Sequence, residues 1–339
     1  MNIASRIYKS LNVMEGERTA ISLLLTHSFF IGVFLSYYLA YANGAFLKAF
    51  DAEMLPYTYV LSGIAGFIAS AIFSHFQKKV AYSRVIIGVL ATIFLLIVSF
   101  IVGIAIIGEA DWLVFVMFVG LIPVFGLVAI QYGGMTMKLF DLRQGKRLFG
   151  IIASGEVISS IIWFFTIPII LPFLGETWYL LVGSLIGLGL GLFFQWVIIG
   201  KFSKQLSVKP KVDTAPKPEA KKEKGSIAAL LKNRYFSLIF FLMILSTLGR
   251  VFTDYSFMGV AKETFADNLA AFFGVFFGLL KVIELITNTF IAGRLLSKYG
   301  VRLGLIILPF LMIIFAVFGV ISYWMGAASM IFLALAMNK

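Results

Sequence analysis

Residues 85–107 read VIIGVLATIFLLIVSFIVGIAII, a run without a single charged side chain. A helix needs about 20 apolar residues to cross the roughly 30 Å hydrocarbon core of a bilayer, so this run has the length of a transmembrane helix. It is typical of a chain of 339 residues that is 61% hydrophobic and only 13% charged. A soluble globule of that composition lacks the polar residues to cover its surface. The sequence therefore predicts an integral membrane protein.

Runs of bilayer length and low charge recur along the whole chain. They predict an all-α fold, a polytopic transmembrane helical bundle. A further apolar run begins at Gly326 and stops with the sequence at Lys339, too early to span, so the last predicted helix is expected to be partial. The nine full predicted spans are residues 21–41, 57–76, 85–107, 112–137, 149–171, 178–199, 235–258, 269–292 and 303–324.

Most of the 28 Lys and Arg residues fall in alternate loops between these spans. The opposite loops are acidic and contain only Lys48 and Lys262 as cations. Basic loops stay in the cytoplasm, so we expect a multi-pass protein of a bacterial inner membrane with a cytoplasmic N-terminus. The same pattern explains the net charge of +12, so we expect no nucleic-acid partner. The basic segments are 6–18, 78–84, 138–147, 201–234 and 294–302.

A long polar segment, rich in lysine, alanine and proline, separates the sixth predicted span from the seventh. Such a composition predicts a disordered linker. Six helices, a basic cytoplasmic linker and more helices is the layout of transporters built from two six-helix halves. We therefore expect an N-terminal six-helix half at 1–200, a linker at 201–233, and an incomplete C-terminal half at 234–339 with three full helices and part of a fourth.

A weak internal repeat favours the same division. Aligning Tyr41 with Tyr255 also places Lys48 on Lys262 and Leu55 on Leu269. Duplicated halves predict a substrate path at their interface, near the middle of the membrane.

Polar residues within the spans are informative, because a charged group in hydrocarbon costs at least about 2.5 kcal/mol and normally faces a partner or a cavity. The third, sixth and ninth spans contain no ionisable residue, so we expect these helices to face lipid on all sides and the others to line a polar path. The polar residues of the other spans are His27 in the first, Gln131 in the fourth, Glu156 in the fifth, Arg250 and Asp254 in the seventh, and Lys281 and Glu284 in the eighth.

Residues 293–302, GRLLSKYGVR, resemble a loop of the major facilitator superfamily, whose pattern is glycine-x-leucine-x-aspartate-arginine-x-glycine-arginine-basic. Ser297 stands in place of the aspartate and Val301 in place of an arginine. The resemblance implies a charged gate at this loop, with Gly293, Lys298 and Arg302 as candidate gating residues.

Other motifs resemble the bacterial relatives of ATP/ADP translocases, the nucleotide-exchange branch of that superfamily. They are residues 140–150, FDLRQGKRLFG, followed by Ser154-Gly155, and Asp254-Tyr255 together with residues 271–274, AFFG. The resemblance implies a twelve-helix antiporter for nucleotides. One departure is Asn43-Gly44 at the outer end of the first span, where the translocases tend to have a basic residue.

The candidate substrate-binding residues are led by two cations that we place near the middle of the membrane, Arg250 and Lys281. Each has a carboxylate one turn away on its own helix, Asp254 and Glu284 respectively. The cations either attract an anionic substrate or are simply neutralised by these partners. Arg250 is preferred, because a guanidinium binds phosphate or carboxylate in a bidentate way. The set is completed by Tyr41, Asn43 and Gln131, although Tyr41 also fits an interfacial aromatic belt.

Glu156 in the fifth span is the candidate for gating or coupling. It either carries a coupling proton or forms a salt bridge with Arg143, Lys146 or Arg147 at a cytoplasmic gate, and we favour the salt bridge. His27 similarly either relays protons or is hydrogen-bonded to a neighbouring helix, and we favour the hydrogen bond.

No enzyme signature is present. The chain has two histidines and no cysteine, which excludes thiolate metal sites and supports neither a zinc site nor a Ser/His/Asp arrangement. The glycine-lysine-serine loop that cradles phosphates in nucleotide-driven pumps is also missing. We expect no enzymatic activity, no cofactor and no metal.

The sequence thus favours a secondary active transporter that moves an organic anion, with a nucleotide as one candidate, by alternating access between two helical halves. The partners would be a small anionic substrate and the lipid bilayer. The alternative is a transporter-like membrane scaffold or sensor that does not transport and serves cytoplasmic domains or partner proteins.

Overall fold

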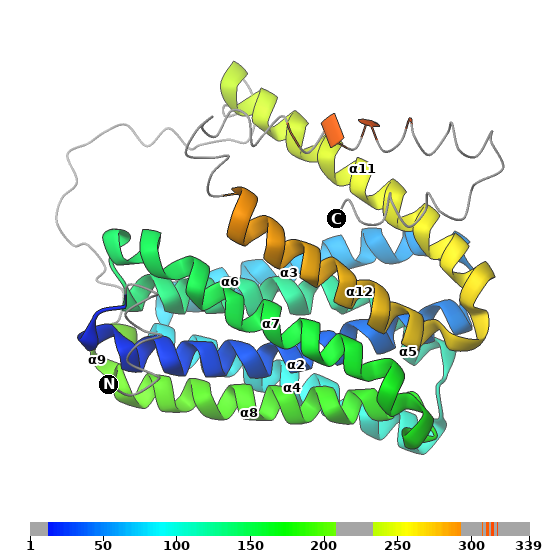
Figure 1. Ribbon diagram of the computed structural model, residues 1–339, viewed down its shortest axis with the longest axis horizontal. Coiled ribbons are helices and arrows are strands. Elements are labelled where there is room, and N and C mark those ends of the chain that lie inside the picture. The colour runs from blue at the N-terminus through cyan, green and yellow to red at the C-terminus, as the bar shows by residue number, and fades with distance from the viewer. Residues whose placement is uncertain are drawn as a thin grey trace. The chain divides into compact units, whose positions relative to one another are not determined.

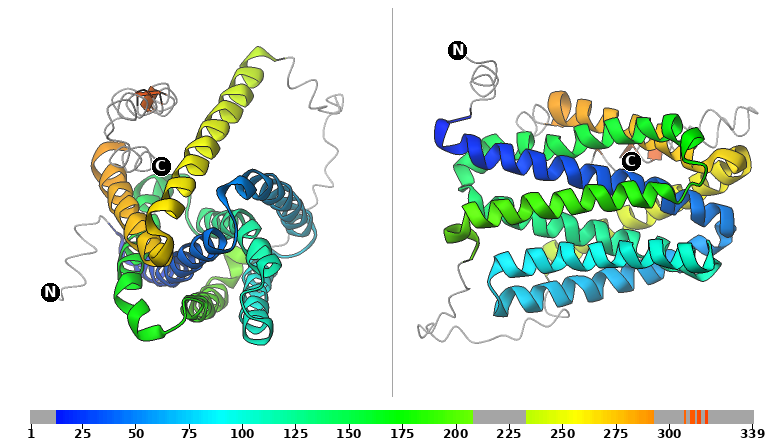
Figure 2. Two further views of the ribbon diagram at one scale, coloured as in Figure 1. Left: turned by 90° about the vertical axis from the view of Figure 1, so that its right-hand side faces the viewer. Right: turned by 90° about the horizontal axis from the view of Figure 1, so that it is seen from below.

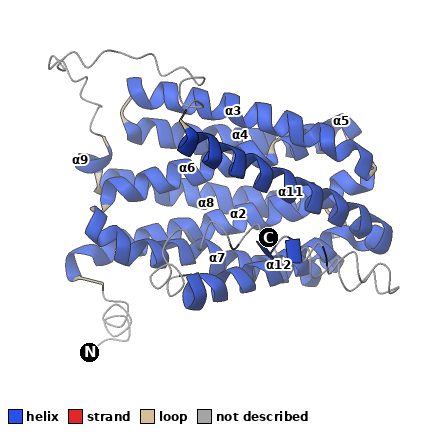
Figure 3. Ribbon diagram, turned by 90° about the horizontal axis from the view of Figure 1, so that it is seen from above, coloured by secondary structure: helices blue, strands red, loops and turns tan. Residues whose placement is uncertain are grey.

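The computed structural model describes residues 13–207 and 233–292, with isolated positions between 307 and 317. All regular elements in these ranges are helices, as predicted (Figure 3). Eight of the helical segments described are long and apolar enough to cross a membrane, and they match the first eight predicted spans. The predicted span 303–324 and the run from Gly326 lie almost entirely outside the described residues. The predicted polytopic helical bundle is confirmed.

From α2 to α9, and again from α11 to η4, the helices follow one another with short connections (Figure 1). The first six spans are α2 (Arg18–Ala49) after η1 (Glu15–Glu17), α3 (Leu55–Lys79) after η2 (Ala52–Met54), α4 (Tyr82–Ile107), α5 (Asp111–Val119) continued by α6 (Leu121–Leu139), α7 (Leu142–Leu174) and α8 (Tyr179–Lys201) with the short α9 (Ser203–Leu206). The last two are α11 (Arg234–Phe265) and, after η3 (Ala266–Asn268), α12 (Leu269–Ile286), which ends in the π-helical η4 (Thr287–Ala292).

The fourth span is broken at Gly120 into α5 and α6 because of a proline in the next turn. Pro123 has no backbone N–H, so the carbonyl of Val119, four residues earlier, loses its helical hydrogen bond. A side chain from α3 replaces it, since the Ser62 hydroxyl donates to the Val119 carbonyl at 2.9 Å. The break therefore leaves no unpaired carbonyl at Val119 and ties α5 to α3.

The described residues divide between two compact units. The first comprises residues 1–210 and 261–293, and the second 211–260 and 294–339. In the first unit α2 packs chiefly against α8 and α7, and α12 packs against α7 and α2 (Figures 1 and 2). The second unit is represented mainly by the part of α11 before Ala261. The eighth span, which the sequence assigns to the C-terminal half, thus packs within the first unit, and the predicted halves themselves stay a prediction.

Small residues allow α2 to approach both of its main neighbours closely. A Cβ atom added to Gly32 of α2 would lie 2.7 Å from the Cβ atom of Ser159 in α7. A Cβ atom added to Gly187 of α8 would lie 2.9 Å from the backbone nitrogen of Phe34 in α2. The Ser184 hydroxyl also donates to the Phe34 carbonyl at 3.0 Å. These contacts make α2, α7 and α8 a closely packed group.

The prediction that the sixth span faces lipid on all sides was wrong. One face of α8 is buried against α2 and contains Ser184, Gly187 and Gly191. Glycine and serine carry no charge, so an absence of ionisable residues does not distinguish a lipid-facing surface from a close helix contact. The third span, α4, likewise packs one face against α8.

The predicted linker begins later than the sequence indicated. Residues 201–207 continue α8 and form α9, where Leu206 is fully buried and the Ser207 hydroxyl is 3.0 Å from that of Ser83. Residues 208–232 lie outside the described part of the chain.

Candidate functional site

Three charged side chains form one cluster between α7 and α12, named here the ion triad: Glu156, Lys281 and Glu284. The Lys281 ammonium lies 3.2 Å from Glu156 Oε1 and 3.1 Å from Glu284 Oε2. Glu156 is also fixed within α7, because the Ser160 hydroxyl donates to its Oε1 atom at 2.9 Å. The predicted pairing of Lys281 with Glu284 is confirmed. The triad also joins two helices that are far apart in the sequence.

Glu156 pairs with Lys281 rather than with Arg147, which corrects the favoured prediction for this carboxylate. Arg147 lies nine residues earlier in α7, about 13 Å along the helix, so the two side chains are too far apart. Arg147 Nη2 instead contacts Glu17 Oε1 at 2.6 Å. The side chains of Arg143 and Lys146, the other predicted partners, lie outside the described residues.

Sequence analysis missed Glu17, which lies just before α2. Its side chain is 6% exposed and accepts from Arg147, from Gln144 Nε2 at 2.9 Å and from the Met14 backbone N–H at 3.0 Å. The available signal was a pair of carboxylates, Glu15 and Glu17, inside the basic segment 6–18. Its partners on α7 could not be assigned, because they lie about 130 residues away in the chain.

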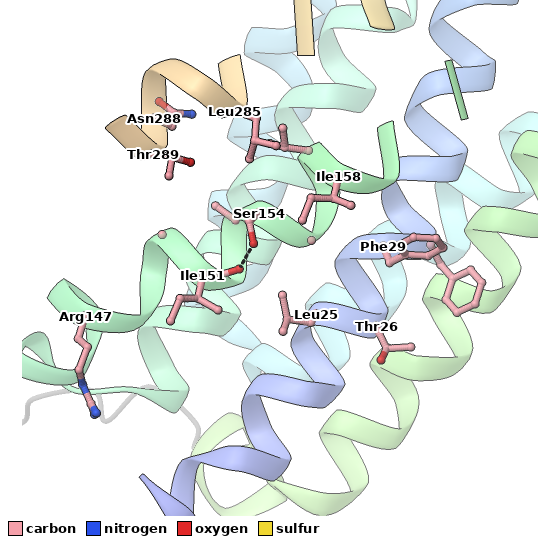
Figure 4. A pocket seen from close by; sticks show the side chains of 15 residues that line it. Leu25, Thr26, Phe29, Arg147, Ile151, Ser154, Ile158, Leu285, Asn288 and Thr289 are labelled. Carbon is pink, nitrogen blue, oxygen red and sulfur yellow. Dashed lines mark hydrogen bonds between the residues drawn. The ribbon is translucent and has the colours of Figure 1, made fainter. Parts of the chain in front are cut away.

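A cavity of about 1050 Å³ lies between α2, α7 and the end of α12 with η4 (Figure 4). Its walls are mostly apolar, with hydroxyl and amide groups and, among the described lining residues, one ionisable group, Arg147. Glu156 lies between the lining residues Gly155 and Val157 in the chain, and Glu284 directly precedes the lining residue Leu285, so the ion triad lies on two of the helices that form the cavity. The residues described as lining the cavity do not include the triad itself. The polar lining residues are Thr26, Arg147, Ser154, Asn288 and Thr289.

Tyr41 and Asn43 lie near the far end of α2, about 20 Å along the helix from the lining residue Phe29. The Tyr41 hydroxyl donates to Glu109 Oε1 at 2.7 Å, and Lys48 lies 3.5 Å from the same carboxylate. Asn43 is buried, and its amide donates to the Leu39 carbonyl at 2.7 Å. The structure therefore does not bring these two predicted substrate residues to the cavity.

The same end of the unit is held together by a contact with the last turn of α11. Lys262 Nζ donates to Asp51 Oδ1 at 2.6 Å and to the Phe50 carbonyl at 3.0 Å. Close by in the chain, Gly44 faces the start of α12, and a Cβ atom there would lie 3.2 Å from the backbone nitrogen of Ala270. The ends of α2 and α12 remote from the cavity are thus in direct contact.

Gln131 lies in the core of the first unit instead of lining the cavity. It is fully buried, and the Gln195 amide of α8 donates to its side-chain oxygen at 3.3 Å. His27 is buried as well, with its Nδ1 atom 2.8 Å from the Gly191 carbonyl and its ring stacked on Tyr132. The hydrogen bond favoured for His27 is confirmed. Among the residues the structure describes, no group of three or more His, Asp or Glu side chains could hold a metal ion.

Arg250 and Asp254 lie one turn apart on α11, in the second compact unit, and the Arg250 side chain is exposed in that unit. Gly293, Lys298 and Arg302, the predicted gating residues, lie outside the described residues. The substrate and gating roles of all these residues stay predictions.

The arrangement of the helices was compared with known proteins. No family model matches the sequence, and no curated protein matches it. A solved structure does match, the crystal structure of the nucleoside transporter NupG, with a TM-score of 0.58. The fold is similar to that of a membrane transporter. The alignment covers 94% of this chain and 78% of that chain at 15% identity, so it shows the fold alone. It supports the predicted major-facilitator-like, multi-pass architecture.

Proposed function

We propose that this chain is a secondary transporter for an organic solute of nucleoside or nucleotide size and works by alternating access between two helical halves. The observation that carries the proposal is the cavity of about 1050 Å³ between membrane-spanning helices, two of which, α7 and α12, also carry the ion triad. Ionisable residues are costly inside a membrane and normally have a functional or pairing role there. The transporter fold supports the same conclusion.

The lining of the cavity supports the solute class. Phe29 and Phe30 present aromatic rings of the kind on which a base packs, and Thr26, Ser154 and Asn288 carry groups that hydrogen-bond sugar hydroxyls and base edges. The substrate named for NupG is a nucleoside, and the motifs of residues 140–155 resemble the nucleotide-exchange branch. An anionic nucleotide and its neutral nucleoside are therefore the two candidates.

We assign the ion triad to coupling rather than to direct binding of an anion. Lys281 already contacts two carboxylates, so the triad has a formal charge of −1 when all three groups are ionised. A cluster of that charge repels an anion unless it takes up a cation or a proton. Its position between α7 and α12 suits a contact that breaks and reforms as helices move during transport.

The contacts at the opposite end support an inward-facing arrangement of the first unit. Gly44 meets Ala270 there, and Lys262 holds Asp51, whereas the cavity lies at the end of the unit that contains Arg147. If the N-terminus is cytoplasmic as predicted, that is the cytoplasmic end.

Uptake by the full-length protein in liposomes tests the proposal. We expect saturable uptake of labelled uridine or uridine monophosphate. The driving force would be an imposed pH gradient, an imposed sodium gradient, or exchange for internal substrate. Empty liposomes are the control for leakage. If correctly folded protein moves no nucleoside, nucleotide or other organic anion under any of these gradients, the carrier proposal fails and the scaffold or sensor alternative takes its place.

Arg250→Gln is expected to lower uptake by at least about tenfold while the protein still inserts, if Arg250 contacts substrate in the way the sequence predicts. Arg250→Lys is the matched variant, because it keeps the charge but loses the bidentate geometry, and it should retain part of the activity. Uptake in both variants and recovery of the proteins from membranes are measured together. Unchanged uptake by Arg250→Gln would remove Arg250 from the binding site.

A further inference from the structure

Arg147 is the charged group of the described cavity wall, and the Glu17 carboxylate is one of its partners. Its side chain is 19% exposed, and its Nη2 atom lies 2.6 Å from Glu17 Oε1. Among the described residues that line the cavity, it is the only ionisable one (Figure 4). An anionic group that enters a largely apolar cavity needs a cation to offset its lost hydration. Arg147 is therefore positioned to supply that charge.

The surroundings of Arg147 form a connected network rather than one surface ion pair. Glu17 accepts from both Arg147 and the Gln144 amide. Gln144 is itself fixed by two reciprocal hydrogen bonds with Asp141: its backbone N–H donates to Asp141 Oδ1 at 2.8 Å, and its side-chain oxygen accepts from the Asp141 N–H at 3.1 Å. These bonds anchor the first turn of α7 and orient the carboxylate that faces Arg147.

Lys281, the cation of the ion triad, is in a different electrostatic situation. It contacts the two carboxylates of the ion triad and is not among the described residues that line the cavity, whereas Arg147 is. A guanidinium also presents a planar fork of donors that matches the oxygens of a phosphate or carboxylate, which an ammonium does not. An incoming oxyanion therefore competes more readily for Arg147.

We infer that Arg147 binds the anionic group of the transported solute and that Glu17 is a positioning residue, which holds the guanidinium at the cavity wall until an oxyanion displaces it. The inference rests on the proposed function and deepens it, because it identifies the solute as a nucleotide-like anion. The ligand chemistry is an oxyanion, either phosphate or carboxylate, attached to an uncharged aromatic body that the apolar wall accommodates.

Binding to the purified full-length protein tests this with three matched ligands: uridine, uridine monophosphate and uridine 5′-carboxylic acid. The wild type is expected to bind the two anions more tightly than uridine. Arg147→Gln should weaken binding of uridine monophosphate at least about tenfold and leave uridine within about twofold. Arg147→Lys should lie between the wild type and Arg147→Gln. Comparison of the two anions shows whether phosphate or carboxylate is preferred.

Glu17→Gln distinguishes competition for Arg147 from a merely structural role, because only competition predicts a change in the affinity for the anion. The amide keeps the hydrogen-bonding oxygen but removes the competing negative charge, so binding of uridine monophosphate is expected to tighten several-fold, with uridine unchanged. The double variant should behave like Arg147→Gln alone. If Arg147→Gln does not fold, Arg147→Lys and Glu17→Gln carry the test.

Three outcomes would overturn the inference. Equal losses for uridine and its monophosphate in Arg147→Gln would indicate a structural role only. No change for either ligand would remove Arg147 from the site, and weaker monophosphate binding in Glu17→Gln would contradict the competition. Failure of the proposed function can be distinguished from failure of the Arg147 inference alone, since the wild type itself would then bind none of the three ligands. In that case the assignment of Arg147 would fail as well.

Discussion

Replacing Lys281 with Gln is expected to lower uptake by at least about tenfold and to lower the thermal stability of the protein. The substitution leaves Glu156 and Glu284 without the ammonium that both now contact at 3.2 and 3.1 Å. Removing one partner of a buried ion pair costs about 3–5 kcal/mol, and the partial exposure of this triad reduces that figure to roughly 1–3 kcal/mol. The contact between α7 and α12 is weakened at the same time. Uptake and thermal unfolding in detergent measure both effects.

Lys48→Gln is the matched control, because it makes the same change in an exposed ion pair. Lys48 lies 3.5 Å from Glu109, and its side chain is 72% exposed. Such pairs contribute at most about 1 kcal/mol, so stability should stay close to that of the wild type. The losses of stability in Glu156→Gln and Lys281→Gln should be strongly non-additive when the two substitutions are combined, since each removes the same contact. Additive effects, or a Lys281→Gln protein as active as Lys48→Gln, would show that the triad has no part in transport.

Gly32→Leu is expected to prevent correct folding of the first unit. A Cβ atom on Gly32 would lie 2.7 Å from the Ser159 Cβ atom and 2.8 Å from the Glu156 carbonyl oxygen. Backbone atoms cannot rotate away, so α2 and α7 would have to separate, and the bond from the Ser159 hydroxyl to the Phe29 carbonyl would be lost. Adding methylene groups to a packed core typically costs about 1–3 kcal/mol of stability. A leucine side chain adds more volume than a single methylene, and here it would meet backbone atoms. The yield of monodisperse protein and its unfolding temperature should both fall sharply.

Gly63→Leu on α3 provides the comparison at a position with open space. Nothing lies within 4 Å of a Cβ atom built there, and leucine is a better helix former than glycine. Yield and unfolding temperature are expected to match the wild type. A Gly32→Leu protein with wild-type stability would mean that α2 and α7 do not pack as closely as the structure shows.

The helical spans could be predicted because hydrophobic length is a local property of the chain. Each of the first eight predicted spans corresponds to a helix. The local signals that were missed are a proline effect and a small-residue surface. Pro123 breaks the fourth span at Gly120, and the face of α8 with Ser184, Gly187 and Gly191 packs on α2 instead of lipid.

Apart from Glu17, the charged residues of the site were recognised individually, but their partners on other helices were not. The pair Lys281 and Glu284 lies within one helical turn, and helical geometry alone predicts it. The contact between Lys281 and Glu156 spans 125 positions in the chain, and that between Arg147 and Glu17 spans 130. Helix periodicity carries no information about such distant pairs, so the wrong partner was assigned to Glu156 and Glu17 was not noticed.

Composition and the spacing of apolar runs were thus enough to establish a multi-pass helical membrane protein, because the length of hydrocarbon to be crossed acts on each segment separately. Tertiary packing decided which charges meet. It placed Arg147 on a cavity wall with Glu17, joined Glu156 to Lys281, and left Tyr41 and Asn43 buried away from the cavity. Those pairings depend on which helix faces approach each other, and the approach depends on small residues such as Gly32 and Gly187 that bring α2 close to its neighbours.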